Sequence, residues 1–186
     1  MTWRREVEAL VGPPAGAPAI VVTLDAGQVR CRIVPAGSVR RMAQNLPGQP
    51  QSTGAEPPAG SAATLRAAPA ALPFPDASVT WVAVWFLGDR SPPPVRRALL
   101  AELVRVLVPA GTLVVVDHNR PRRRLAAIVA AVAMSPRPPG ATPAAAWRRL
   151  GYPVAREAHA AGFIVDRLRL AAGERIQIIS ASRAGA

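Results

Sequence analysis

The clearest pattern along the chain is a buried strand, an amphipathic helix and a second buried strand. Residues 79–86 (VTWVAVWF) are β-branched and aromatic, with turn residues on both sides. Ser91 and three prolines then favour the start of a helix, and apolar residues recur at helical spacing over 95–107. Residues 112–116 (TLVVV) form another apolar run. Two strands joined by one helix over so few residues predict neighbouring parallel strands.

The C-terminal third predicts a helix and a closing hairpin. Residues 153–161 have a helical pattern that ends at Gly162, and residues 163–170 and 175–182 read as two strands joined by a short turn. Together with the parallel pair, this predicts a single α/β domain over residues 1–186. Residues 47–63 are polar and rich in Pro and Gly, which predicts a flexible loop.

Composition narrows the class of protein. The 186 residues are 50% hydrophobic, enough to bury a core, and the net charge of +12 comes from arginine alone. The absence of lysine indicates a GC-rich genome, which weakens the case for a nucleic-acid partner. A single cysteine, Cys31, excludes a disulfide framework, and two separated histidines do not suggest a metal site. Residues 125–134, the longest uncharged apolar stretch, are about half a membrane span, so a cytoplasmic protein is expected.

Three segments carry a family resemblance: residues 72–78 (LPFPDAS), 101–111 (AELVRVLVPAG) and 160–163 (AAGF). They resemble the class I S-adenosylmethionine-dependent methyltransferases, in particular the type 11 branch that includes quinone-biosynthesis methylases. The resemblance covers residues 64–183. It implies a doubly wound, Rossmann-like sheet of seven strands in the order 3-2-1-4-5-7-6, with only strand 7 antiparallel. S-adenosylmethionine would then lie over the carboxyl ends of the strands.

The N-terminal part departs from the pattern that this family implies. After strand 1 the family has an acid and then a glycine-rich turn, for which residues 10–16 (LVGPPAG) are the candidate. Gly12 and Gly16 stand at glycine positions, but Leu10 replaces the acid and Pro14 offers no N–H donor. Asp25 could bind the ribose only if a strand ended at residues 23–24 and the glycine turn lay before it.

Two further cofactor positions lack polar side chains. Residues 28–34 (QVRCRIV) read as strand 2, and Val34 stands where the family has the acid that binds the ribose. Counting back from Leu72, itself a positional match, Ala68 stands where an acid after strand 3 would bind the adenine. Each lost hydrogen bond costs about 1–3 kcal/mol. The sequence therefore predicts weak or absent binding of S-adenosylmethionine.

A polar cluster follows the second buried strand, at Asp117, His118 and Asn119. His118 could take a proton from a methyl acceptor while Asp117 holds it, and Asn119 and Trp85 could line the substrate pocket. The alternative is that the polar residues cap a helix and end the strand, and that Trp85 packs in the core.

Three functions remain open at this point. The first is methyl transfer from S-adenosylmethionine to a small-molecule acceptor. The second is a non-catalytic, degenerate methyltransferase that serves as a binding or assembly partner, with a protein partner or as a homodimer. The third is an anion- or nucleic-acid-binding module that uses the arginines of residues 120–124. The absence of interleaved aromatic residues disfavours nucleic acid.

Overall fold

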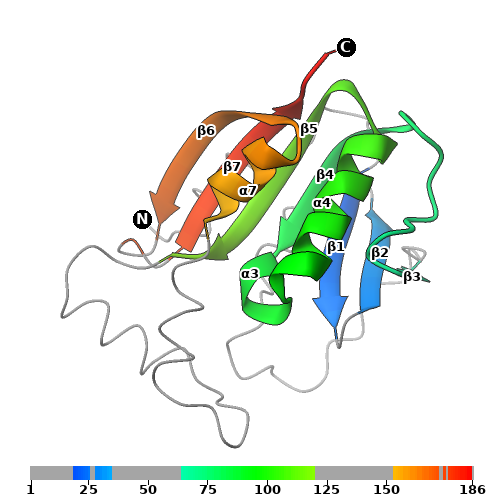
Figure 1. The fold of residues 1–186 in the computed structure, drawn as a ribbon, viewed down its shortest axis with the longest axis horizontal. Coiled ribbons are helices and arrows are strands. Elements are labelled where there is room, and N and C mark those ends of the chain that lie inside the picture. Colours follow the sequence, from blue (N-terminus) through cyan, green and yellow to red (C-terminus); the bar gives the residue numbers. More distant parts are fainter. Residues whose placement is uncertain are drawn as a thin grey trace, which may run out of the picture.

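The computed structural model describes residues 19–25, 28–34, 64–119, 153–171, 174 and 176–185. Seven strands form one mixed sheet (Figure 1). They are β1 (Ala19–Asp25), β2 (Gln28–Val34), β3 (Thr64–Ala67), β4 (Val79–Trp85), β5 (Leu107–His118), β6 (Phe163–Ala171) and β7 (Ile176–Arg183). The described helices are α3 (Leu87–Arg90), α4 (Pro93–Val106) and α7 (Val154–Ala160). The predicted loop at 47–63 lies outside these residues.

The predicted strand order is confirmed: β3-β2-β1-β4-β5-β7-β6. Strands β4 and β5 are neighbours and parallel, as the pattern of residues 79–116 predicts. Strand β7 is antiparallel to both β5 and β6, so the closing hairpin is confirmed as well.

The direction of β2 differs from the expectation that only strand 7 is reversed, which is wrong. Strand β2 is antiparallel to β1 along its whole length, from Asp25 opposite Gln28 to Ala19 opposite Val34. Strand β3 is in turn antiparallel to β2. The physical reason is the connection, because only two residues separate β1 from β2. A parallel pair needs a crossover of a dozen residues or more.

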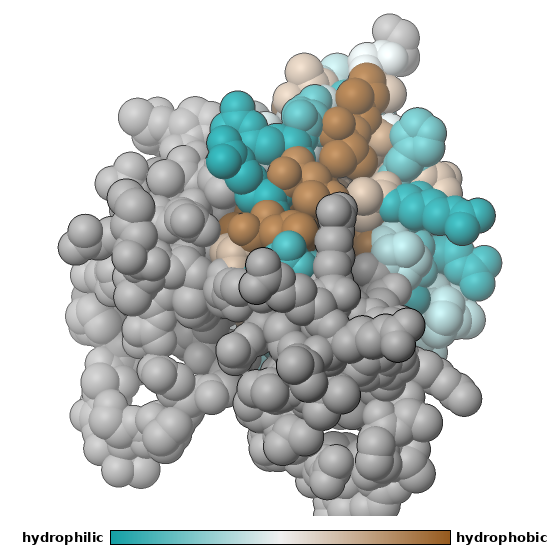
Figure 2. Space-filling view, turned by 90° about the vertical axis from the view of Figure 1, so that its left-hand side faces the viewer, coloured by the Kyte–Doolittle hydropathy of each residue, from teal (hydrophilic) through white to brown (hydrophobic). Residues whose placement is uncertain are grey.

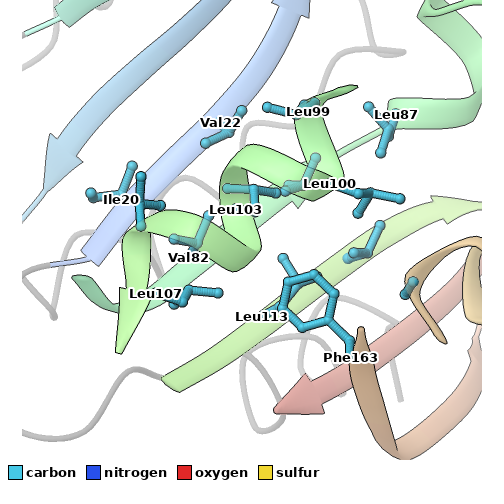
Figure 3. Close-up of a cluster of buried hydrophobic side chains, with 14 of the residues drawn as sticks. Ile20, Val22, Val82, Leu87, Leu99, Leu100, Leu103, Leu107, Leu113 and Phe163 are labelled. Carbon is cyan, nitrogen blue, oxygen red and sulfur yellow. The ribbon is translucent and has the colours of Figure 1, made fainter. Parts of the chain in front are cut away.

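Helix α4 covers the β1–β4–β5 part of the sheet. Its buried side chains include Leu99, Leu100 and Leu103, which point toward Val22 and Val82 of the sheet (Figure 3). The helix begins after Pro92, and no side chain caps it. The expectation that Ser91 caps it is wrong, because the Ser91 hydroxyl donates to the Leu87 carbonyl of α3.

Helix α7 lies on the same side of the sheet as α4 (Figure 1). An ion pair joins the two helices: the Arg96 guanidinium donates to both oxygens of Glu157, at 3.0 and 2.8 Å. Arg96 also donates to the Ser91 carbonyl at 2.7 Å, which fixes the start of α4. A second buried cluster contains Trp81, Trp85 and Val114, whose side chains alternate with those that face α4.

Candidate functional site

The candidate site is the edge of the sheet at which β1, β4 and β5 end. These three strands are parallel, with Thr23 beside Trp85 and Trp85 beside Val116. Asp25, Phe86 and His118 therefore come at the same edge. This is the carboxyl edge, where open α/β sheets bind ligands.

Asp117 is fully buried at this edge, with 0% of its surface exposed. One carboxylate oxygen accepts a hydrogen bond from the Gly88 N–H at 2.6 Å, and the other accepts one from the His118 N–H at 2.7 Å. A buried carboxylate requires such donors. Both donors are backbone N–H groups, so Asp117 connects the first turn of α3, which follows β4, to the end of β5.

Phe86 and His118 form an aromatic pair beside this carboxylate. Their ring centroids are 4.5 Å apart, with a tilt of 31° between the planes. Phe86 has left-handed backbone angles, φ 52° and ψ 47°, and its N–H donates to the Val116 carbonyl at 2.7 Å. A bulky residue in this conformation is unusual, and such positions concentrate at binding sites.

The residues that follow β5 are bonded to the β6–β7 hairpin. The Asn119 amide donates to the Glu174 carbonyl at 2.8 Å, and the Gln177 amide donates to the His118 carbonyl at 2.7 Å. Trp85 is buried, with 5% exposed, and belongs to the second core cluster. These contacts are structural, and the roles of Trp85 and Asn119 in substrate binding stay predictions.

Among the described residues, the predicted cofactor positions Val34 and Ala68 lie at opposite edges of the sheet. Gly12 and Gly16 lie outside the described residues, and they precede β1 in the chain, whereas the expectation placed them after strand 1. Val34 ends β2 as predicted, but it lies opposite Ala19, at the far edge of the sheet from His118. Its expected place beside the ribose is therefore wrong, because β2 runs in the reverse direction.

Ala68 does follow β3 at the carboxyl edge, because Ala67 pairs with Val29 near the start of β2. Its backbone forms a bridge with Ala71, and the side chain is exposed. Leu72 is buried, and its N–H donates to Glu102 of α4 at 2.9 Å. Leu72 is thus a contact of α4, and a cofactor role for Ala68 stays a prediction.

Asp25 ends β1 at the carboxyl edge of the sheet. The sequence made a ribose role depend on a strand that ends at residues 23–24 after a glycine turn. Strand β1 ends one residue later, and residues 10–16 lie outside the described residues. However, β1 lies next to β4, in the place that the family gives to strand 1. A cofactor role for Asp25 therefore stays a prediction. The sequence signal for the end of β1 was an apolar run over residues 19–24 that is followed by Asp25, with Gly27 two residues later.

Two of the three segments that carry the family resemblance contact each other. Arg105 of α4 donates to Asp76 at 2.5 Å, to the Phe74 carbonyl at 3.0 Å and to the Leu72 carbonyl at 3.2 Å. It also bonds Glu102, with Nη2 donating to Oε2 at 2.8 Å. We call Glu102, Arg105 and Asp76 the α4 clamp. The bonds from Arg105 lower the pKa of Glu102, and those from Glu102 and Asp76 raise the pKa of Arg105.

Metal binding and thiol chemistry find little support in the described part of the chain. There, no group of three or more His, Cys, Asp and Glu side chains could hold a metal ion. Cys31 is buried against the core, and desolvation raises the pKa of its thiol to about 11, which keeps it protonated and unreactive. No described helix is long and apolar enough to cross a membrane.

No protein-family model matches the sequence, and no curated protein matches it. Among solved structures, the chain is similar to a SAM-dependent methyltransferase from Aquifex aeolicus, with 22% identity and a TM-score of 0.44 over 64% of this chain and 54% of that one. A methyltransferase from Methanosarcina mazei has 17% identity and a TM-score of 0.45 over 80% of this chain and 77% of that one. The [4+2]-cyclase SpnF has 15% identity and a TM-score of 0.44 over 64% and 55%.

The chain spans about half the length of the first and third of these proteins. Likenesses of this size carry no argument about function, which must rest on the residues of the chain itself. The strand order and the reversed β7 define the class: an α/β protein with a methyltransferase-like fold.

Proposed function

We propose that this chain is a degenerate, non-catalytic methyltransferase-like protein that serves as a binding or assembly partner. The observation that carries the proposal is the hairpin of β1 and β2, in which Asp25 pairs with Gln28. It replaces the turn from strand 1 to a helix on which a class I methyltransferase binds its cofactor. We further propose that the protein is cytoplasmic.

The hairpin removes the donors that the cofactor requires. A glycine-rich turn that opens a helix offers several backbone N–H groups to a ligand. Only residues 26 and 27 lie between β1 and β2, too few for a five-residue glycine motif and a following helix. The reversal of β2 also moves its last residue, Val34, away from the carboxyl edge. Two lost sets of hydrogen bonds, at about 1–3 kcal/mol each, weaken binding by roughly one to four decades.

A second candidate, methyl transfer to a small molecule, is favoured by the Phe86–His118 pair. His118 lies at the carboxyl edge against the ring of Phe86. An imidazole there could take a proton from an acceptor hydroxyl or amine. Asp117, by contrast, binds the backbone of Gly88 and His118. It fits a positioning role better than a catalytic one.

Calorimetric titration of the purified chain with S-adenosylmethionine tests the proposal. We expect a millimolar dissociation constant or no detectable binding. The variants Val34→Asp and Ala68→Asp place the same acid at opposite edges of the sheet and form a matched pair. Because Val34 lies at the far edge, Val34→Asp should not restore cofactor binding. A micromolar dissociation constant for the unmodified chain would overturn the proposal. Methyl transfer would then be the favoured function. Loss of turnover in His118→Ala, with cofactor binding retained, would assign His118 as the base.

A further inference from the structure

The outer edge of β6 carries an unusual set of exposed apolar side chains. β6 is the last strand of the sheet, and none of the described strands pairs with its outer side. Ile164, Leu168 and Leu170 are 54%, 49% and 37% exposed, and only Ile33 joins them among the exposed large hydrophobics of the described residues. Figure 2 shows this side of the molecule, where an apolar stripe is flanked by hydrophilic residues.

The apolar residues lie on both faces of the strand. Leu168 pairs with Ile179, whose side chain belongs to the core cluster under α4 and α7. Ile164 pairs with Ser182, one position from Ala181 of that cluster, and therefore points to the opposite face. A strand added at the outer edge would thus cover apolar surface above and below the sheet.

Charge on β6 is divided between its two halves. The first half, residues 163–166 (FIVD), ends in Asp166, and the second half, residues 167–171 (RLRLA), contains Arg167 and Arg169. An antiparallel second copy of β6 would place the acidic half against the basic half, so that Asp166 of each copy meets the arginines of the other. A parallel copy would place arginine against arginine, which is unfavourable.

We propose that β6 pairs antiparallel with β6 of a second copy of this chain, so that two sheets join about a twofold axis. Edge strands usually resist such pairing through charges and bulges, and β6 has both, with a shift in register between Val165 and Arg167. Here the charges have both signs and complement a reversed copy. A twofold interface requires this kind of self-complementary surface. The proposal deepens the assembly role proposed above by naming the partner, and it does not require that role to be correct.

A charge-swap experiment tests the pairing. Asp166→Arg makes the strand wholly basic, and the double variant Arg167→Asp with Arg169→Asp makes it wholly acidic. We expect the unmodified chain to sediment as a dimer, each variant alone to be monomeric, and an equimolar mixture of the two to form a heterodimer. The matched control is Arg66→Asp on β3, the opposite edge strand, which should leave the dimer intact.

Several outcomes would overturn the proposal. These are an unmodified chain that is monomeric at about 100 µM, a dimer that survives both swaps, or a dimer lost in Arg66→Asp alone. Should the swapped variants fail to fold, Leu168→Cys provides a second route. The buried Cys31 should not react, so a thiol cross-linker should join two Leu168→Cys chains and leave Arg66→Cys chains single. Titration with S-adenosylmethionine reports on the proposed function separately, whatever the oligomeric state.

Discussion

The two sides of the sheet are built in different ways. From β4 to β6, the structure alternates strands with α4 and α7, and the two helices are joined by Arg96 and Glu157. From β1 to β3, neighbouring strands are antiparallel, and only two residues connect the first pair. The first side has the strand order and closing hairpin that the sequence predicts, and the second side departs from the predicted strand direction.

Two of the segments that carry the family resemblance have a structural role. The motifs at residues 72–78 and 101–111 meet in the α4 clamp, where Arg105 holds the chain that leads into β4. The side chains of the α4 clamp contact backbone groups and one another, so their role in the fold does not depend on a cofactor.

The largest expected effect contrasts the cores of the two sides. Leu103 of α4 is fully buried, whereas Leu65 of β3 is partly buried against the same cluster. Leu103→Ala should cost about 2–5 kcal/mol of the free energy of unfolding, and Leu65→Ala about 1 kcal/mol, because less surface is lost there. Urea unfolding measures both. Equal losses would show that the two sides contribute alike to the core.

A smaller effect depends on pH. The folded pKa of Glu102 lies below its ordinary value of 4.5, chiefly because Arg105 donates hydrogen bonds to it. The stabilising contribution is therefore complete above the unfolded pKa and is lost as the pH falls through the lowered folded pKa. Glu102→Gln should destabilise the protein at pH 7 and flatten its loss of stability below about pH 4.5. Thermal unfolding across this range provides the measurement, and unchanged curves would contradict the clamp.

The smallest expected effect on stability concerns the backbone conformation of Ala110, near the start of β5. Ala110 has a φ of 60°, a left-handed value that glycine adopts without strain. Ala110→Gly should stabilise the protein by up to about 1 kcal/mol. The matched change Ala67→Gly, in strand β3, should destabilise it by about 0.5–1 kcal/mol. Two changes of the same sign in thermal unfolding would count against this assignment.

Much of the fold could be predicted because its signals are local. The apolar run of residues 79–86, the helical spacing of residues 95–107 and the glycine after residue 161 correspond to β4, α4 and the end of α7. The direction of β2 was missed because the family expectation outweighed the short connection between residues 25 and 28. The polar cluster lies at the end of β5, as the pattern of residues 112–119 predicts, but the contacts of Asp117 and Leu72 were not foreseen.

The sequence by itself determined the strands and helices of residues 79–118 and 153–183, because periodicity and turn residues act over a few positions. Tertiary structure alone decided what the polar groups do. Asp117 meets a backbone N–H 29 residues away, and Arg105 reaches a carbonyl 33 residues away. Such pairs form only once the sheet has brought distant segments together, since a buried charge takes whichever donors the packed fold presents to it.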